Sequence, residues 1–416
     1  MNNINKKTSN NDKYLNNTID RKTPVENVLV LQGGGSLGAF ACGAYKALLR
    51  KNLKFDIIAG TSIGAINGAI IAGSKNNNPA QDLEDFWLEL AESSYTIIPD
   101  MITFDYDDKT KVTKLKTIPS ASLNAAFYGV PKMFVPRWFQ TNISNNSNNI
   151  NDKNSFIQWL PWNWTYIYDN SALGKTLEKY IDFKKLSLHD QSEIKDRGMN
   201  SNYSSSSSSE NIRLIVTAVN VLNSKPLIFD SFKMQIQLKH LLASVGYPNY
   251  GFSWVEVEDG VYGWDGSLLS NTPMREVILQ SPSNDKNIFI VENYSKKINE
   301  LPSDMTEVQA RIKDILYGDK TESFRQISKL LTRHLELIEN MYNELEFSKM
   351  NTKKADYIKK EYQQLVHKYG AKILNITKIS RGNTESPYPL QNADFSIHTV
   401  KSLIKEGEDN AMKVLE

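Results

Sequence analysis

The sequence predicts a three-layer α/β domain followed by a mostly helical C-terminal extension. The first indication is that a strand, a glycine loop, a helix, a second strand and a second helix follow one another between residues 27 and 72. The second is that amphipathic stretches replace short apolar runs after residue 292. We therefore expect a disordered polar tail over residues 1–24, an α/β domain over residues 25–300 and a helical extension over residues 301–416.

The α/β rhythm begins with two short strands. Residues 27–32 (NVLVLQ) form an apolar run that ends at glycines, and residues 55–59 (FDIIA) form the next. Small apolar residues at helical spacing predict a helix over residues 36–50. Residues 63–72 are small and apolar throughout, which predicts a buried helix.

The middle of the chain is less regular. The Asn- and Ser-rich residues near 141–154 and the serine run near 198–210 predict mobile surface insertions. The α/β rhythm then returns, with strands predicted at residues 213–219, 261–264 and 287–291.

Three helices are predicted in the C-terminal extension, residues 301–416. Residues 321–345 carry apolar side chains at steps of three and four, which predicts a long amphipathic helix. Residues 354–368 predict a second helix, and Asp394 or Ser396 can cap a last one. The pattern favours packing of these helices on the α/β body, and a homodimer through them is the alternative.

Composition excludes several classes of protein. The chain has 416 residues, Lys+Arg 49 and Asp+Glu 47, so its net charge of +2 argues against nucleic-acid binding. A single cysteine, Cys42, excludes an intramolecular disulfide and a Cys-rich zinc site. The five histidines are scattered, so we expect no metal and no cofactor.

No signal for membrane insertion or general secretion is present. No apolar run approaches the roughly 18–20 residues of a bilayer span. The first 24 residues lack the apolar centre of a secretory signal. We expect a cytoplasmic or peripheral membrane protein, and specialised export stays open.

The pattern Gly60-Thr61-Ser62-Ile63-Gly64 lies between a predicted strand and a predicted helix. A serine on such a tight turn is held in strained backbone geometry with its hydroxyl above the sheet edge, and the glycines leave room for the close approach. The context predicts a nucleophile elbow, with Ser62 as the nucleophile.

A second glycine pattern, Gly33-Gly34-Gly35-Ser36-Leu37-Gly38, follows the first strand. Converging backbone N–H groups there can bind an anion, either a phosphate or the oxyanion of an acyl-transfer intermediate. A dinucleotide site is disfavoured because the second strand runs into the elbow instead of ending at an acidic residue. Asp265, before Gly266 at the end of a late strand, can reach across to an elbow serine.

Together these three motifs resemble the patatin-like phospholipase family. Similar flanking segments are found at residues 84–87, 242–248 and 263–273, and residues 394–396 resemble the tail of a bacterial subgroup with a helical extension. The resemblance covers residues 25 to about 291. Leu37 departs from the Arg or Lys of many members, and Ser267 from their Gly or Ala.

The resemblance implies a serine lipid acyl hydrolase with a three-layer α/β/α sandwich fold of the patatin type. Ser62 would be the nucleophile and Asp265 its base, and the Gly34 and Gly35 amides would hold the oxyanion. An ordinary aspartate is a poor base at neutral pH, so Asp265 must be desolvated. The substrate would be an acyl lipid, and no metal would be needed.

Two other functions remain as alternatives. An α/β-hydrolase esterase would use a Ser-His-Asp triad with one of the three downstream histidines His334, His367 or His398. A catalytically weak lipid-binding or scaffold protein would act through its C-terminal helices.

Two aromatic clusters admit two interpretations. They either flank the site and contact acyl chains or a membrane surface, or they fill the core of a cap. The first comprises Phe127, Tyr128, Met133, Phe134, Trp138 and Phe139, and the second Trp159, Leu160, Trp162, Trp164, Tyr166 and Ile167.

Overall fold

The computed structural model describes most of the chain. The described residues are 23–107, 112–118, 120–140, 164–187, 212–294, 297–298, 301–302, 305–318, 321–382 and 391–416. Both predicted insertions and all but the last two residues of the predicted tail lie outside them, as do Trp159, Leu160 and Trp162 of the second aromatic cluster.

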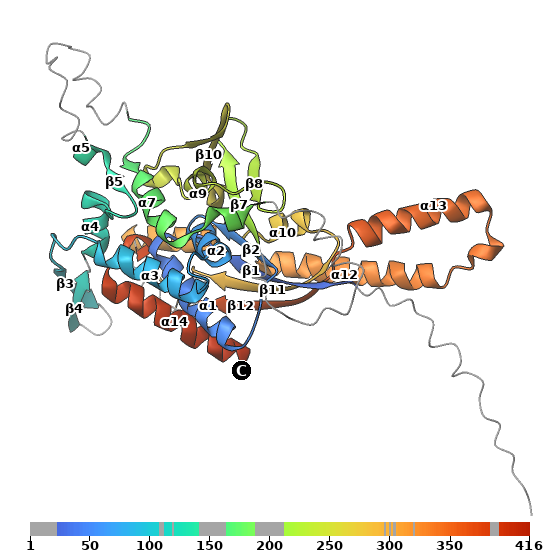
Figure 1. The fold of residues 1–416 in the computed structure, drawn as a ribbon. Helices are drawn as coiled ribbons and strands as arrows, with labels where there is room; N and C mark the ends of the chain where they lie inside the picture. Colours follow the sequence, from blue (N-terminus) through green and yellow to red (C-terminus); the bar gives the residue numbers. More distant parts are fainter. Residues whose placement is uncertain are drawn as a thin grey trace, which may run out of the picture.

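An eight-stranded mixed sheet forms the centre of the molecule (Figure 1). The strand order is β12-β11-β1-β2-β7-β10-β9, and β8 also pairs with β7. The run from β12 to β7 is parallel, whereas β8 and β10 are antiparallel to β7. The strands are β1 (Val25–Leu31), β2 (Ile57–Thr61), β7 (Arg213–Asn220), β8 (Pro226–Asp230), β9 (Val255–Glu258), β10 (Val261–Asp265), β11 (Asp285–Glu292) and β12 (Ile373–Ser380).

Apolar side chains cover both faces of this sheet, as its parallel strands require. Leu29 and Leu31 of β1 face a core shared with α1 and α2, whereas Val28 and Val30 face a second core that contains Met274 of α10. The predicted three-layer α/β class is therefore confirmed. The helices are α1 (Ala39–Arg50), α2 (Ile63–Ala72), α3 (Pro79–Glu92), α4 (Ala121–Tyr128), α5 (Arg137–Gln140), α7 (Ser171–Tyr180), α9 (Leu238–Ser244), α10 (Met274–Gln280), α11 (Met305–Tyr317), α12 (Thr321–Asn343), α13 (Thr352–Tyr362) and α14 (Ile397–Leu415).

Two features of the first half differ from the sequence-based expectation. The helix predicted from residue 36 begins with a 3-10 turn, Gly35–Gly38, and becomes α-helical only at Ala39. A hairpin of β3 (Met101–Asp107) and β4 (Val112–Ile118) was not predicted at all.

The C-terminal residues are less purely helical than predicted. β12 pairs with β11 in parallel and extends the main sheet. Sequence reasoning missed it because its sequence, ILNITKIS, is half polar and lies on an edge. α14, which Ser396 caps as predicted, crosses α1 so closely that a Cβ on Gly43 would lie 1.7 Å from the Ile404 carbonyl oxygen. The described C-terminal residues thus complete both the sheet and one helical layer.

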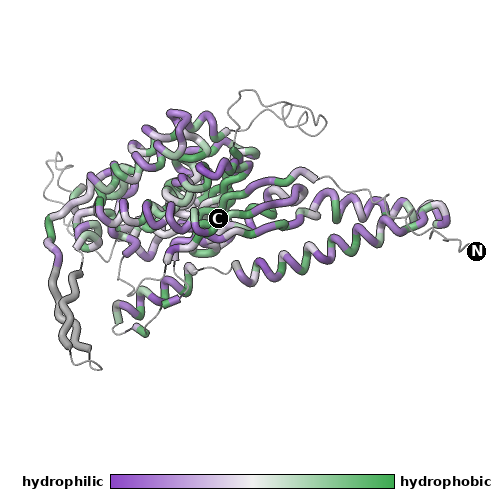
Figure 2. The backbone as a smooth tube through the Cα atoms, turned by 90° about the horizontal axis from the view of Figure 1, so that it is seen from below, coloured by the Kyte–Doolittle hydropathy of each residue, from purple (hydrophilic) through white to green (hydrophobic). Residues whose placement is uncertain are grey.

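An arm formed by α12 and α13 projects from this body (Figure 1). Phe324, near the start of α12, packs against the second core. Ile327, Leu331 and Met341 of the predicted apolar stripe remain 58%, 57% and 61% exposed, so packing on the body does not extend along the helix. Figure 2 shows the resulting mixture of polar and apolar residues along the arm. The homodimer through these helices stays a prediction.

No helix within the described ranges combines the length and the hydropathy that a bilayer span requires.

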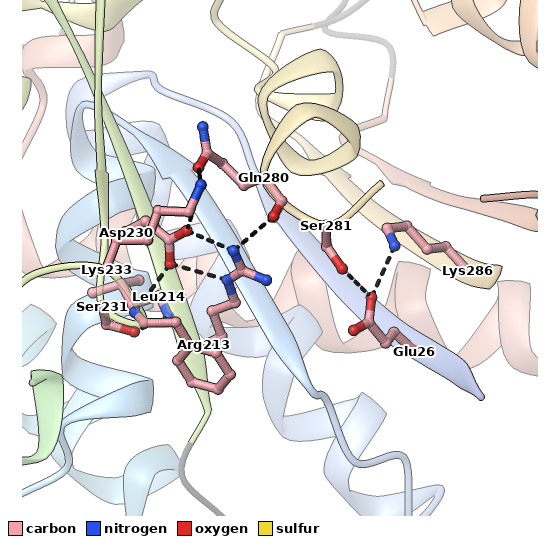
Figure 3. Close-up of polar contacts among 10 residues, drawn as sticks. Glu26, Arg213, Leu214, Asp230, Ser231, Lys233, Gln280, Ser281 and Lys286 are labelled. Carbon is pink, nitrogen blue, oxygen red and sulfur yellow. Dashed lines mark hydrogen bonds and ion pairs between the residues drawn. The ribbon is translucent and has the colours of Figure 1, made fainter. Parts of the chain in front are cut away.

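Two buried ion pairs lie where β1, β7 and β11 begin (Figure 3). Arg213 donates to both carboxylate oxygens of Asp230, at 2.9 and 2.6 Å. The fully buried Lys286 donates to Glu26 at 2.8 Å. Each charge has a partner, which offsets its desolvation. The buried charges at this end of the sheet are therefore paired.

Candidate active site

Ser62 occupies a strained turn between β2 and α2. Its φ of 57° and ψ of −129° lie in a region that residues with a side chain rarely adopt. The turn is tight, because a Cβ on Gly60 would lie 2.3 Å from the backbone of Gly64. A Cβ on Gly64 would in turn lie 2.2 Å from the Leu31 carbonyl oxygen. The two glycines are therefore a steric requirement of the turn that holds Ser62.

Hydrogen bonds to the neighbouring strand β7 fix this turn. The Ser62 amide donates to the Ser244 hydroxyl at 3.0 Å, and that hydroxyl donates to the Thr217 carbonyl at 2.7 Å. The hydroxyls of Thr61 and Thr217 also pair at 2.7 Å. The strained residue is thus held from both sides.

Sheet pairing brings Asp265 to Ser62. β2 ends with Thr61 beside Thr217 of β7, and the next residue of β7, Ala218, pairs with Asp265 of β10. β8 occupies the other edge of β7 at Ala218, so β10 must lie on the edge where β2 ends. The end of β10 therefore faces the end of β2, and the Asp265 carboxyl lies within hydrogen-bonding reach of the Ser62 hydroxyl.

The Asp265 carboxyl is almost completely buried, with 1% of the residue exposed. Burial raises its pKa to about 6, although hydrogen bonds from Ser62 and from the amide and hydroxyl of Ser267 oppose the rise. The Ser267 amide donates to Asp265 Oδ1 at 2.8 Å. Among the described residues no cation forms an ion pair with this carboxyl. It combines elevated basicity with an ordered hydrogen-bond environment.

The predicted glycine loop divides into two parts. Gly34 and Gly35 line the cavity together with Ser62, and within the described residues neither of their amides donates a hydrogen bond. Gly35 has a φ of +57°, and a Cβ there would lie 2.2 Å from the Asn392 carbonyl oxygen. Gly33 and Gly38 do not line the cavity. A Cβ on Gly33 would lie 2.5 Å from Asn271, and one on Gly38 2.8 Å from Ile63, so both positions serve close packing.

Gln32, which sequence reasoning did not assign to the site, clamps this loop. Its side-chain oxygen accepts from the amides of Asn293 and Tyr294 at 2.7 and 3.3 Å. Its amide nitrogen donates to the Thr272 hydroxyl at 3.0 Å and to the Tyr317 carbonyl at 2.9 Å. One buried side chain thus joins the glycine loop to β11, α11 and the segment after Asp265. Sequence reasoning could not detect this role of Gln32, since its hydrogen-bond partners are distant in sequence.

A cavity of about 290 Å³ opens beside Ser62 and Asp265. The apolar lining residues include Phe134, Phe252 and Phe395. The ring centroid of Phe134 lies 5.4 Å from that of Phe252 and 6.4 Å from that of Phe395. Met133 and Ile167, from the two predicted aromatic clusters, line the same cavity, whereas Trp138 and Phe139 are 38% and 39% exposed. The clusters therefore contribute both to the cavity and to the surface.

Five tyrosines also line the cavity, and four of them, which we call the tyrosine group, lie together. Tyr247 lies 4.9 Å from Tyr250 and 6.0 Å from Tyr317 between ring centroids, and Tyr294 lies 5.5 Å from Tyr317. Tyr317 belongs to α11 and Asn392, another lining residue, to the segment before α14. The C-terminal residues thus form part of the cavity, a contribution that sequence reasoning missed.

None of the four histidines in the described ranges lines the cavity. His334, His367 and His398, the candidates for a triad, are all exposed. His240 is buried, stacks on Phe229 and accepts a hydrogen bond from the Gln237 amide at 3.0 Å. Burial lowers its pKa to about 4, so it is a neutral structural residue.

A comparison with family models identifies the family of this chain. The patatin-like phospholipase family model matches residues 29–278, more than half of the chain. A patatin-like phospholipase domain-containing protein of Caenorhabditis elegans is 31% identical over 78 residues, 19% of this chain and 7% of that protein. The lysophospholipase nte1 of Aspergillus terreus is 54% identical over 44 residues, 11% of this chain and 3% of that protein. The chain thus spans less than a tenth of the length of these relatives.

Among solved structures, the crystal structure of VipD from Legionella pneumophila aligns with a TM-score of 0.36 and 14% identity. The alignment covers 94% of this chain and 67% of that one.

Proposed function

The chain belongs to the patatin-like phospholipase family, and on that premise we propose that it hydrolyses carboxylic ester bonds of acyl lipids through a Ser62–Asp265 dyad. The observation that carries the proposal is the buried Asp265 carboxyl within hydrogen-bonding reach of a strained serine hydroxyl. Both side chains face one cavity with an apolar side large enough to hold part of an acyl chain.

In the proposed reaction Asp265 takes the proton of the Ser62 hydroxyl as the oxygen attacks the ester carbonyl carbon. The Gly34 and Gly35 amides donate hydrogen bonds to the oxyanion of the tetrahedral intermediate. Asp265 then protonates the leaving alcohol oxygen, and the acyl chain stays on Ser62. Water attacks this acyl-enzyme while Asp265 again accepts a proton. Asp265 then returns that proton to the Ser62 oxygen as the acyl–oxygen bond breaks, and the carboxylic acid leaves.

The alternatives fit the site less well. A triad needs a histidine beside the serine, and the described histidines lie outside the cavity. A scaffold acting through α12 and α13 has no use for a strained Ser62 or for unpaired loop amides. Exposed Phe127, Trp138 and Phe139 near the cavity support contact with a lipid surface, which we include in the proposal.

The direct test measures ester hydrolysis with p-nitrophenyl octanoate and with a phospholipid. We expect Ser62→Ala and Asp265→Asn each to lower kcat at least about 10³-fold, because each removes a group that acts in the transition state. A variant with all five histidines replaced should retain activity if circular dichroism shows that it is folded. Loss of activity in that folded variant would support the triad, and an inactive wild-type protein would contradict the proposed function.

The pH profile provides an independent test. Asp265 must be ionised to act as a base, so kcat/KM should fall tenfold per pH unit below a pKa of about 6. Rates measured between pH 4.5 and pH 8.5 would reveal this acid limb. A limb near the ordinary aspartate pKa of about 3.9 would contradict desolvation of Asp265.

A further inference from the structure

A buried asparagine, Asn293, binds the glycine loop at the point where the ladder between β1 and β11 stops. The last backbone bond of that ladder runs from the Gln32 amide to the Val291 carbonyl, at 3.2 Å. Asn293 follows β11 directly and is 0% exposed. Its Nδ2 donates to the Gln32 carbonyl at 2.8 Å and to the Gly33 carbonyl at 3.3 Å. One side-chain amide thus takes the place of a longer strand as the partner of the loop.

The orientation of Asn293 is fixed by its own hydrogen bonds. Two carbonyl oxygens can accept only from the NH2 group of the side-chain amide, so Nδ2 and not Oδ1 faces the loop. The backbone amide of Asn293 donates to Gln32 Oε1 at 2.7 Å. Its backbone carbonyl accepts from Nη1 of Arg381, the residue after β12, at 3.0 Å. Asn293 is therefore a rigid support for the loop that it binds.

This support sets the direction of the Gly34 amide. In a trans peptide unit the C=O and the N–H point in opposite directions, and the described residues contain no cis peptide bond. The Gly33 carbonyl points to Asn293 Nδ2, so the N–H of the same peptide unit, that of Gly34, points away from Asn293. Gly34 lines the cavity and Asn293 does not. The Gly34 amide is therefore directed to the cavity side of the loop.

The two amides proposed for the oxyanion hole differ in what orients them. The Gly34 carbonyl accepts from the Leu37 amide at 3.2 Å, so the backbone of the 3-10 turn sets the direction of the Gly35 amide. The Gly34 amide depends instead on the side chain of Asn293. A Cβ on Gly34 would lie 3.1 Å from Asn293 Cβ, which shows how closely the two residues pack. A substitution at Asn293 can thus disturb one donor and leave the other in place.

We propose that Asn293 is a positioning residue for the oxyanion hole, which holds the Gly33–Gly34 peptide so that the Gly34 amide meets the oxyanion of the tetrahedral intermediate. The inference rests on the proposed acyl hydrolase function, and Asn293 acts in it through the loop and not on the substrate. A preorganised donor stabilises the oxyanion because it needs no reorientation during the reaction. Without Asn293 this peptide can rotate, and part of that stabilisation is lost.

Hydrolysis of p-nitrophenyl octanoate by Asn293→Ala tests the proposal. We expect kcat to fall roughly 10–100-fold and KM to stay within about twofold, because the Gly34 donor acts on the transition state and not on the bound ester. The acid limb of kcat/KM should stay at the same pH, since Asn293 is not among the groups that set the pKa of Asp265. A variant that had lost the architecture of the site would change KM and this limb as well.

Asn67→Ala is the matched control. Asn67 is also 0% exposed, and its Nδ2 donates to the Gly38 carbonyl at 2.9 Å, in the part of the loop that does not line the cavity. Both variants lose a buried bond to a loop carbonyl, so both should unfold at lower urea concentration than wild type. We expect Asn67→Ala to keep kcat within about threefold of wild type, because it touches neither oxyanion donor.

Two ketones separate the oxyanion from the rest of the ligand. An octyl trifluoromethyl ketone accepts the Ser62 oxygen at its carbonyl carbon while Asp265 takes the hydroxyl proton, and the ketone oxygen becomes an oxyanion. An octyl methyl ketone binds through the same chain without forming the adduct. We expect Asn293→Ala to weaken inhibition by the trifluoromethyl ketone roughly 10–100-fold, in line with the loss in kcat/KM, and inhibition by the methyl ketone by less than about twofold.

An unchanged kcat in Asn293→Ala would overturn the positioning role while the acyl hydrolase function stood. So would an equal fall in kcat in Asn67→Ala, or an equal loss of affinity for the two ketones. If circular dichroism shows that Asn293→Ala is unfolded, Asn293→Ser takes its place with the same expected results. Its hydroxyl leaves a smaller void and ends one bond closer to the backbone than the amide nitrogen. A wild-type protein that cleaves no ester would contradict the proposed function itself.

Discussion

The two ends of the central sheet treat buried charge in opposite ways. Where β1, β7 and β11 begin, Glu26 pairs with Lys286 and Asp230 with Arg213 (Figure 3). Where β2 and β10 end, Asp265 is buried without a cation among the described residues.

The pKa shifts of the two carboxyls at opposite ends of the sheet record this difference. Burial alone would raise the pKa of Glu26, but the charge of Lys286 and hydrogen bonds from Lys286, Asn284 and Ser281 outweigh it and lower that pKa. Burial dominates at Asp265 and raises its pKa to about 6. The lowered pKa of Glu26 favours folding at neutral pH, whereas burial also lowers the pKa of Lys286 and opposes part of that gain. The unpaired end gives up stability for basicity, as the proposed catalytic role of Asp265 requires.

The largest effect on stability is expected from breaking an ion pair at the end of the sheet where β1, β7 and β11 begin. Arg213→Met removes both hydrogen bonds of the guanidinium to Asp230, which is 1% exposed, and leaves only Lys233, at 4.0 Å, as a cation beside it. We expect the free energy of unfolding to fall by about 3–5 kcal/mol, measured by urea denaturation at pH 7. Arg213→Met combined with Asp230→Asn should recover part of the loss. A change below about 1 kcal/mol would show that the pair contributes little.

A stability change of the opposite sign is expected at the candidate active site. Asp265→Asn removes a carboxylate whose pKa in the folded protein is about 6, against an ordinary value of 3.8. It should therefore stabilise the protein by on the order of 1–3 kcal/mol at pH 7. A raised folded pKa gives stability that is present at low pH and is lost as pH rises through that pKa. The gain from Asp265→Asn should therefore shrink towards pH 4. Thermal unfolding of wild type and Asp265→Asn between pH 4 and pH 7 measures this gain in stability. A variant that is less stable than wild type at pH 7 would contradict the comparison.

The smallest expected effect concerns the contribution of the Ser267 hydroxyl to the pKa of Asp265. Ser267→Ala keeps the backbone hydrogen bond to Asp265 and removes the one from the hydroxyl. Loss of a bond that favours the ionised carboxyl should raise its pKa further, by roughly half a unit. The acid limb of kcat/KM would move to higher pH by that amount. Ser270→Ala, which removes a nearby hydroxyl that does not contact Asp265, is the control. A shift to lower pH in Ser267→Ala would exclude this role of the hydroxyl.

Local patterns in the sequence determined the elements that carry Ser62 and the glycine loop. The conformation of a strand-to-helix turn depends on the few residues that form it, so the spacing of Gly60, Ser62 and Gly64 was sufficient to predict the elbow. The apolar runs of β1, β2, β7 and β11 were likewise readable, because strands buried on both faces must be apolar throughout. The edge strand β12 was not predicted from the sequence because it lacks that constraint.

Only the tertiary structure decided what surrounds Ser62. Asp265 reaches it because β10 pairs with the edge of β7 on which β2 ends, a consequence of strand order that no local pattern encodes. The clamp at Gln32 and the contribution of Tyr317 and Asn392 to the cavity depend on partners far apart in sequence. Burial is also a property of the whole fold. The raised pKa that Asp265 needs in its proposed role as a base could therefore be required from its chemistry but located only in three dimensions.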